Sequence, residues 1–202
     1  MRHDVVLDGP AHRLRPVELT DAGAIVELRR HPDLSRFLHE TDSSVATQER
    51  WLHAYLERDG DLYWAIERRA DGAVDGFVGI YDVADGTAEW GRWILRPGSL
   101  AAPESAWLVH EAGFGPLGLD CLIARTLVEN RPVVAFHERY GAEVGPILPA
   151  HATIRGVPHD AVETRTTRNR WRSTAEPFLR SAAERAARLL QRASTAPRTT
   201  GS

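Results

Sequence analysis

The stretch EWGRWILRPGSLAAPESAW, residues 89–107, combines a strand, a turn and the first turns of a helix. Large apolar residues alternate with others up to the turn, a period of two that is typical of a strand. Pro97 and Gly98 then mark the turn, and Pro103 followed by Glu104 indicates a helix N-terminus. A strand, a short loop and a helix N-terminus form an arrangement that proteins use to hold a phosphate group. The stretch therefore predicts a strand-to-helix connection with a candidate anion site in its loop.

Three segments in which apolar and polar residues alternate come before the loop at residue 96, and Asp-Gly turns separate them. The alternating segments are residues 62–68, 74–83 and 87–95. Asp-Gly turns between such segments are strong hairpin signals, so they predict an antiparallel meander. After the opening stretch the period changes: residues 103–118 and 131–142 are helical, with a strand at 121–128 between them. A strand, a helix and a second strand in succession predict a parallel crossover.

The two ends of the chain add further elements. On the N-terminal side, residues 12–19 predict a short strand, and Thr20 and Thr47 each predict the N-cap of a helix. Near the other end, residues 142–149 and 162–171 predict a final strand pair. Together the elements predict an α/β fold with a mixed, mostly antiparallel central sheet flanked by helices.

A C-terminal amphipathic helix is predicted at residues 175–194. Its expected apolar side consists of Phe178, Leu179, Ala182, Ala186, Leu189 and Leu190. From Thr195 onward the composition favours a disordered tail. We therefore divide the chain into a domain at residues 1–172 and a C-terminal helix with its tail at residues 173–202.

Composition excludes several classes of protein. The chain has 202 residues, of which 43% are hydrophobic and 26% charged, as in a soluble globular domain. It contains no apolar run of about 18 residues and no apolar leader, which predicts neither a membrane span nor a secretory signal. The single cysteine, Cys121, excludes an internal disulfide and predicts a cytoplasmic location. No HExxH or paired Cys/His spacing occurs, so no metal site is expected.

Three local motifs carry a resemblance to a known family. AEWGRWI, residues 88–94, is similar to a strand usually written A-E-I-G-Y-x-I, and NRPVVAFHERYGA, residues 130–142, is similar to N-x-x-[AV]-[IV]-x-[LF]-Y-x-x-x-G-F. FGPLGLDCLIARTLVEN is similar to the helix end and strand that precede the second motif. Over residues 12–171 the chain thus resembles the GCN5-related N-acetyltransferase (GNAT) superfamily, and most closely its ribosomal-protein and amino-sugar acetyltransferase branch. The resemblance makes residues 1–172 a GNAT-like acyltransferase domain.

The resemblance implies transfer of an acyl group from acetyl-CoA, or another acyl-CoA, to an amine. The amine must lose a proton before it attacks, the thioester oxygen must be stabilised, and the leaving thiolate needs a proton. Glu89 matches the branch's acidic residue and is the predicted base. The alternative is a strand residue that merely pairs with a neighbouring arginine.

His137 stands where the family usually carries a tyrosine that protonates the leaving thiolate. An imidazole can donate a proton near neutral pH, so His137 is the predicted donor. The alternatives are contact with the thiolate without chemistry, or a plain polar helix residue. Tyr140, three residues further on, is a substitute donor.

The same resemblance implies contacts with coenzyme A and with the acceptor. The residues expected to bind coenzyme A are Trp93, Ile94, Leu95, Arg96, Gly98, Ser99, Ala101, Ala102, Asn130 and Phe136. Asn130 is expected to hold the pantetheine arm, and capping of the next helix is a compatible second role. Most aromatic residues nearby are expected to be core, but Trp90 and Trp51 are expected to wall the acceptor pocket.

The loop after the strand departs from the family pattern [QR]-x-x-G-x-[GA], whose backbone N–H groups hold the pyrophosphate of coenzyme A. Residues 96–104 are about three residues short of the family spacing. Ala101 and Ala102 are small enough for close approach but, unlike glycine, do not favour positive φ. We interpret the loop as a modified phosphate cradle.

The expected acceptor is the primary amine of a small molecule, such as an amino sugar or a natural-product intermediate. Two other functions stay open. Residues 163–202 carry nine arginines against three glutamates, which would suit an acyl donor on a carrier protein or tRNA, although no nucleic-acid motif occurs. The altered loop and the missing tyrosine would suit a GNAT-like binding protein without catalysis. The arginine-rich helix also leaves a homodimer contact open.

Overall fold

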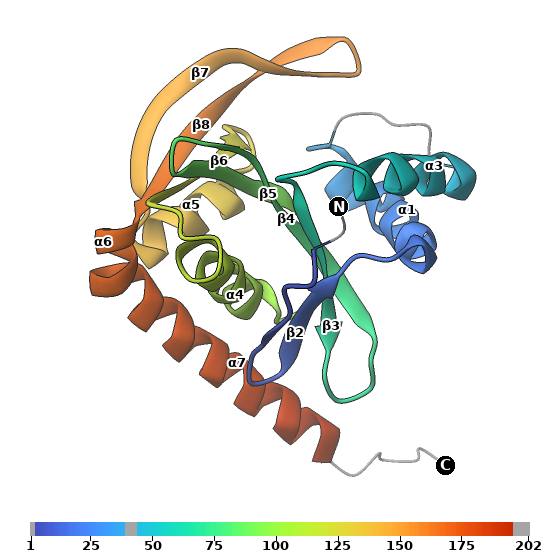
Figure 1. The fold of residues 1–202 in the computed structure, drawn as a ribbon, viewed down its shortest axis with the longest axis vertical. Helices are drawn as coiled ribbons and strands as arrows, with labels where there is room; N and C mark the ends of the chain where they lie inside the picture. Colours follow the sequence, from blue (N-terminus) through green and yellow to red (C-terminus); the bar gives the residue numbers. More distant parts are fainter. Residues whose placement is uncertain (1–2, 39–43, 196–202) are drawn as a thin grey trace.

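The computed structural model describes residues 3–38 and 44–195, and within them one sheet of eight strands forms the centre of the fold (Figure 1). The strands are β1 (Leu7–Asp8), β2 (His12–Pro16), β3 (Leu62–Arg68), β4 (Val74–Ala84), β5 (Thr87–Leu95), β6 (Cys121–Leu127), β7 (Glu143–Ile154) and β8 (Val157–Thr167). They lie in the order β1-β2-β3-β4-β5-β6-β8-β7 across the sheet. Every neighbouring pair is antiparallel except β5 and β6. The predicted mixed, mostly antiparallel sheet is therefore confirmed.

Helices flank this sheet on both sides. They are α1 (Ala22–Arg30), α2 (Pro32–Ser35), α3 (Val45–Leu56), α4 (Ala102–Phe114), α5 (Arg131–Tyr140), α6 (Arg168–Arg170) and α7 (Glu176–Thr195), with a 3₁₀ helix η1 (Leu19–Asp21) and a π-helix η2 (Trp171–Ala175). Figure 1 shows α1 and α3 on one side of the sheet and α4 and α5 on the other. Helix α4 connects β5 to β6, which makes the predicted parallel crossover.

Strand β3 is buried on both faces and separates two core clusters. Leu62, Trp64 and Ile66 pack in the cluster that includes α4 and α7, whereas Tyr63 and Ala65 pack in the cluster that includes α1 and α3. This division follows from the alternation of side chains along a strand. The central strands are thus held by packed side chains from both sides.

The C-terminal helix packs against the body of the protein. Helix α7 lies along α4 (Figure 1), and Leu179 belongs to the same core cluster as Trp64. The buried positions of α7 are Leu179, Ala183, Ala186 and Ala187. Leu189, which the apolar pattern placed on this face, is 53% exposed, so that part of the pattern is wrong. The domain boundary after residue 172 stays a prediction, and the expected tail beyond Thr195 lies outside the described residues.

Both predicted helix caps are wrong. Helix α3 begins at Val45 because the Ser44 side chain accepts a hydrogen bond from the Thr47 N–H group at 3.1 Å. Thr20 lies inside η1 rather than before a helix. Before α3 both Ser44 and Thr47 fit the local rule and only the backbone path selects Ser44, whereas at α1 the intervening 3₁₀ turn moves the N-cap from Thr20 to Asp21.

The parallel ladder between β5 and β6 is short. It contains three residue pairs, from Thr87–Cys121 to Glu89–Ile123, and ends there. Further along, β5 remains paired with β4 and β6 remains paired with β8. The two strands therefore separate into a wedge that opens toward their C-terminal ends.

A bulge interrupts β5 just beyond this ladder. The register with β4 shifts between Gly91 and Ile94, so Arg92 and Trp93 together face a single residue of β4. Arg92 has a φ of 49°, in the left-handed region that residues with side chains rarely adopt. A bulge leaves one residue outside the ladder. It therefore places backbone groups that the sheet does not pair next to the apex of the wedge.

Candidate active site

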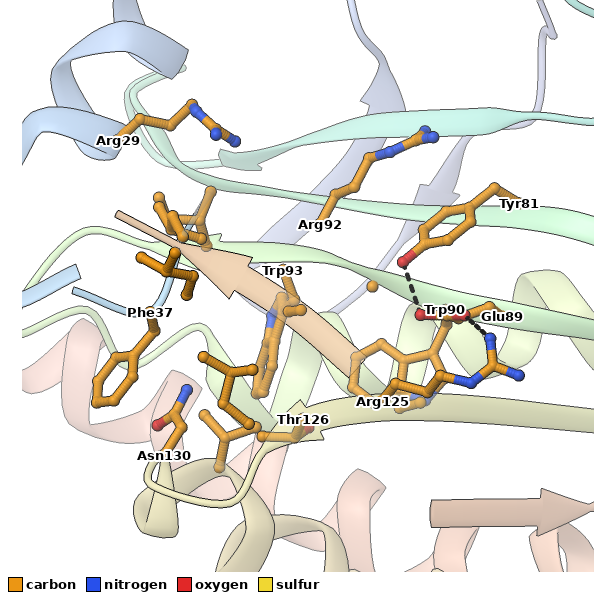
Figure 2. Close-up of a pocket in the computed structure, with 18 of the residues that line it drawn as sticks. Arg29, Phe37, Tyr81, Glu89, Trp90, Arg92, Trp93, Arg125, Thr126 and Asn130 are labelled. Carbon is orange, nitrogen blue, oxygen red and sulfur yellow. Dashed lines mark hydrogen bonds and ion pairs between the residues drawn. The ribbon is translucent and has the colours of Figure 1, made fainter. Parts of the chain in front are cut away.

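The wedge between β5 and β6 opens into a pocket of about 460 Å³. Its walls come mainly from α1, α3, β5, β6, α5 and β7. Figure 2 shows Glu89 with Tyr81 and Arg125 at one end of the pocket, and Phe37 and Asn130 at the other. A concave, largely apolar site with a few convergent polar groups is typical of a small-molecule pocket.

Glu89 is the only carboxylate among the described residues that line the pocket. Its Oε1 accepts a hydrogen bond from the Tyr81 hydroxyl at 3.0 Å, and its Oε2 accepts one from Arg125 at 2.5 Å. Burial raises the pKa of Glu89, while the Tyr81 hydrogen bond and the Arg125 charge oppose that rise. A buried carboxylate with a raised pKa is suited to accept a proton. Glu89 also forms the ion pair with a neighbouring arginine that was expected if it had no catalytic role, and its partner is Arg125.

Gly91 makes room for the hydroxyl that contacts Glu89. A Cβ at residue 91 would lie 2.4 Å from the Tyr81 oxygen, so a side chain there would displace Tyr81. Burial, then the charge and the hydrogen bond of Glu89, raise the pKa of Tyr81. The hydroxyl therefore stays protonated and donates to the carboxylate.

Tyr81 and Arg125 are absent from the residues predicted from sequence. Counting back from the Asp85-Gly86 turn places Tyr81 opposite Trp90, but a register shift between Tyr81 and Ala84 pairs Tyr81 with Glu89 instead, so no local pattern pointed to Tyr81. Arg125 had no local signal either. Its approach to Glu89 depends on how β6 leaves the parallel ladder, which no local pattern fixes.

Arg92 braces one wall of the pocket. Its guanidinium forms two hydrogen bonds with Asp61, at 2.5 and 2.9 Å, and lies over the rings of Trp51, Tyr63 and Tyr81. The distances to the three ring centroids are 5.5, 5.8 and 4.3 Å, within the range of cation–π contacts. Trp51, which was predicted to wall the acceptor pocket, lines this pocket and is held in place by its contact with Arg92.

Trp90 and His137 form the inner wall, with ring centroids 5.1 Å apart. The Nδ1 atom of His137 lies 2.9 Å from Thr164 Oγ1, and its Nε2 has no hydrogen-bond partner in the described structure. Burial, together with nearby His110, lowers the pKa of His137 to about 3. His137 is therefore neutral near pH 7, and its role as the proton donor stays a prediction. Tyr140 is 1% exposed and does not line the pocket.

The residues expected to bind coenzyme A fall into two groups. Trp93, Ile94 and Asn130 line the pocket, whereas Leu95, Phe136 and residues 96–102 do not. Asn130 makes no side-chain capping bond with α5 and lies at the pocket end opposite Glu89 (Figure 2). Phe136 packs behind two pocket residues, with its ring centroid 5.3 Å from that of Trp93 and 6.1 Å from that of His137.

Residues 96–101 form the loop between β5 and α4, outside the pocket. Two of its N–H groups are used inside the loop: Ser99 donates to the Arg96 carbonyl at 3.0 Å, and Ala101 donates to Ser99 Oγ at 3.1 Å. Three other N–H groups here make no hydrogen bond in the described structure: those of Gly98 and Leu100 in the loop, and that of Ala102, the first residue of α4. Unused N–H groups at the start of a 13-residue helix are suited to bind a phosphate group. The loop therefore has the donors that the pyrophosphate of coenzyme A would need.

Other site types find no support in residues 3–38 and 44–195. No group of three or more His, Cys, Asp or Glu side chains in this part of the chain is placed to hold a metal ion. None of its helices has the length and apolar character needed to cross a bilayer.

Comparisons with known proteins agree on the family. The profile described as an acetyltransferase (GNAT) domain matches residues 12–143, which is more than half of the chain. Curated protein sequences gave no significant match.

Solved structures share the fold over most of the chain. Apo FdhC, described as a nucleotide-linked sugar GNAT, has 26% sequence identity and a TM-score of 0.73, covering 88% of this chain and 98% of its own. A GCN5-related N-acetyltransferase from Brucella melitensis has 24% identity and a TM-score of 0.74, covering 91% and 85%. A spermidine N-acetyltransferase variant from Vibrio cholerae has 18% identity and a TM-score of 0.72, covering 82% and 98%. The protein belongs to the GNAT family of acetyltransferases.

Proposed function

We propose that the protein transfers an acetyl group from acetyl-CoA to the primary amine of a small molecule, with Glu89 as the base. The observation that carries this proposal is the position of Glu89. Its carboxylate lies at the last pair of the β5–β6 ladder, where the wedge begins, and faces the pocket. A thioester that enters the wedge and an amine in the pocket would meet beside this carboxylate.

The amine reaches the site mostly as an ammonium ion and must lose a proton to attack. Glu89 accepts that proton, directly or through a water molecule, and its raised pKa makes the transfer easier than for an ordinary glutamate. Arg125 and the Tyr81 hydroxyl hold the carboxylate in one orientation. The pocket wall thus supplies a base and fixes its direction.

The bulge at Arg92 and Trp93 supports the second requirement, stabilisation of the thioester oxygen. A bulge leaves its extra residue outside the regular ladder, and an N–H group that the ladder does not use can donate to a ligand. Such donors stabilise an oxygen that gains negative charge. We assign this role to the backbone at the bulge.

His137 is proposed to contact the leaving sulfur as a neutral imidazole. If the Thr164 hydroxyl donates to Nδ1 at 2.9 Å rather than to the more distant Ala124 carbonyl at 3.5 Å, the proton of His137 lies on Nε2, which has no other partner in the described structure. That N–H group can donate a hydrogen bond to sulfur without carrying a positive charge. The thiolate then takes its proton from the protonated nitrogen of the tetrahedral intermediate, which becomes the amide, or from solvent.

The loop before α4 is proposed to hold the pyrophosphate as a modified cradle. Its free N–H groups and the N-terminus of α4 would replace the glycine-rich pattern of the resembled branch. Asn130 and the edge of β5 at Trp93 and Ile94 would line the path between this loop and Glu89.

A sugar amine is the acceptor that we propose. The support is the 26% identity to FdhC, a nucleotide-linked sugar GNAT, over 88% of this chain. Among the described residues, three arginines and one carboxylate line the pocket, which suits a polyamine less well.

The proposal is tested by following free thiol release from acetyl-CoA. We expect acetyl-CoA at about ten times its Kd to raise the melting temperature, because binding adds stability by mass action. Thiol should appear only when an amino sugar or a nucleotide-linked amino sugar is added. Binding without turnover on any amine would favour a non-catalytic protein. Turnover only with an acylated carrier protein or tRNA would favour the other donor classes.

Tyr81→Phe should move the acidic limb of the kcat/KM profile to higher pH. Burial raises the pKa of Glu89 and the Tyr81 hydrogen bond lowers it, so removal of the hydroxyl should raise that pKa further. The active base is the ionised form, and a higher pKa therefore demands a higher pH for the same activity. Tyr55→Phe is the matched control, because the Tyr55 hydroxyl donates to Asp61 and does not line the pocket. An unchanged limb in Tyr81→Phe would contradict the assignment of Glu89 as the titrating base.

A further inference from the structure

A buried histidine lies beneath the loop that precedes α4. His12 begins β2 and is fully buried. Its Nδ1 lies 2.7 Å from Glu104 Oε2, and its Nε2 lies 3.1 Å from Asp75 Oδ2. Both ring nitrogens face carboxylates, which can only accept hydrogen bonds when they are ionised, so the geometry selects the doubly protonated imidazolium.

The first carboxylate, Glu104, belongs to the first turn of α4 and is fully buried. Its Oε1 accepts hydrogen bonds from the N–H groups of Ala11 and His12, at 2.8 and 3.0 Å. Gly9 leaves space for this carboxylate, because a Cβ there would lie 2.2 Å from Oε1. The start of α4 is therefore fixed to β2 through charged and backbone hydrogen bonds.

The second carboxylate, Asp75, connects His12 to the loop itself. Its Oδ2 also accepts a hydrogen bond from Ser99 Oγ at 3.1 Å, and Ser99 Oγ in turn accepts the Ala101 N–H at 3.1 Å. The Asp75 carbonyl accepts the Arg96 N–H at 2.7 Å. Both ends of residues 96–101 are thus tied to Asp75, one through its backbone carbonyl and the other through the carboxylate that contacts His12.

Charge balance explains why the cation matters. Glu104 and Asp75 place two negative charges under a helix N-terminus, and the charged groups that face them are His12 from β2 and Arg68 from β3, at 3.8 Å from Asp75. With His12 protonated, the four groups are neutral together. Without that proton they carry a net negative charge, which would repel a phosphate group at the loop.

We propose that His12, as an imidazolium, is a positioning residue for the pyrophosphate of acyl-CoA. It does not touch the ligand. It holds Asp75, Ser99 and the start of α4 so that the free N–H groups of the loop converge, and it cancels the carboxylate charges beneath them. This role compensates for the shortened loop that lacks the glycine-rich pattern. It rests on the proposed function only in that acyl-CoA is the ligand of this loop.

Protonation of His12 extends over the working range of pH. Burial alone would lower the pKa of His12, but hydrogen bonds and charges from Asp75 and Glu104 outweigh it and raise the pKa to about 9. Affinity for a pyrophosphate-containing ligand should therefore be constant below about pH 8 and fall between pH 8 and pH 10. A ligand without the pyrophosphate should not share this dependence.

The test compares S-ethyl-CoA with S-ethyl-pantetheine, two thioethers that do not hydrolyse and that differ in the nucleotide and pyrophosphate. Titration calorimetry measures the first, and ligand-detected NMR measures the weaker second. We expect His12→Gln to raise the Kd of S-ethyl-CoA by about tenfold or more, because one neutralising charge is lost near the phosphate. The Kd of S-ethyl-pantetheine should change by less than about twofold. A general packing role for His12 would weaken both probes alike and would overturn the proposal.

Ser99→Ala provides a second variant at the partly exposed end of the same chain of hydrogen bonds. It should also weaken S-ethyl-CoA selectively, and the double variant should lose less than the sum of the single losses. Arg13→Gln is the matched control, since Arg13 follows His12 on β2 but pairs with Asp8 at the surface. If His12→Gln does not fold, Ser99→Ala and the wild-type pH dependence decide. An effect of the same size in Arg13→Gln, or additive losses, would contradict the proposal.

The two proposals fail in different ways. If the wild-type protein binds neither acetyl-CoA nor S-ethyl-CoA at pH 7.5, the proposed function fails and the role of His12 fails with it. If the wild type binds both and releases thiol with an amine, but His12→Gln binds S-ethyl-CoA as well as wild type does, only the role of His12 is overturned.

Discussion

Glu89→Gln lowers kcat for acetyl transfer by about 10²- to 10⁴-fold, the usual contribution of a general base, while the Kd of acetyl-CoA stays within about twofold. Glutamine keeps the size of the side chain and can still accept from Tyr81, but it cannot take a proton from an ammonium ion. The measurement is single-turnover kinetics with saturating amine, combined with calorimetry for acetyl-CoA.

The pH profile separates catalysis from simple damage to the pocket. Because the pKa of Glu89 is raised, wild-type kcat/KM should increase with pH through a value above the ordinary range for glutamate. The Gln variant should lack this limb.

Glu163→Gln is the matched control for that experiment. Glu163 contacts the same arginine, with 3.3 Å between its Oε2 and Arg125 Nε, but it does not line the pocket. We expect at most about a tenfold loss of kcat, because Arg125 keeps its bond with Glu89. A loss in Glu163→Gln equal to that in Glu89→Gln would show that the arginine network, and not the base, controls the rate.

Leu179→Ala should reduce the free energy of unfolding by about 2–5 kcal/mol, the range for Leu-to-Ala changes at buried sites. Leu179 is fully buried and packs in the same core cluster as Trp64, although it belongs to the C-terminal helix α7. Its loss leaves a cavity between α7 and the body of the protein. Urea denaturation followed by both circular dichroism and tryptophan fluorescence measures the change and shows whether one transition is retained.

Leu189→Ala makes the same chemical change about three helical turns away, at a side chain that is 53% exposed. It should alter stability by no more than about 0.5 kcal/mol, as is usual for surface substitutions. If both variants lose the same amount, the loss arises in the helix itself and not in its contact with the core. If Leu179→Ala loses nothing, α7 behaves as the separate C-terminal segment predicted from sequence.

The fold was predictable wherever the signals were local. The Asp71-Gly72 and Asp85-Gly86 turns marked the two hairpins that join three strands, and the change from period two to helical period after Leu95 marked the crossover. The register within those hairpins was not predictable, because it shifts at bulges. The two-residue strand β1 escaped because its pairing with β2 depends on a neighbour and not on its own pattern. The cap of α3 escaped because both Ser44 and Thr47 met the local rule.

The candidate site was predictable only in part. Glu89, Trp90 and Trp51 line the pocket, but their roles stay predictions. What sequence could not supply was every contact between distant segments, such as Arg125 with Glu89 or His12 with Glu104. The charge state of His137 also depends on burial, and burial is a property of the folded chain that a motif does not contain.

Cys121 occupies the closed end of the wedge, where it pairs with Thr87 in the short parallel ladder. It is the sole thiol of the chain and is buried. A thiol reagent reaches such a side chain only when β5 and β6 part transiently, so the labelling rate of native protein reports how often this junction unfolds locally. Pantetheine bound between the same two strands should slow the labelling of Cys121. The labelling rate would then report whether the acyl-CoA site is occupied, without any catalytic turnover.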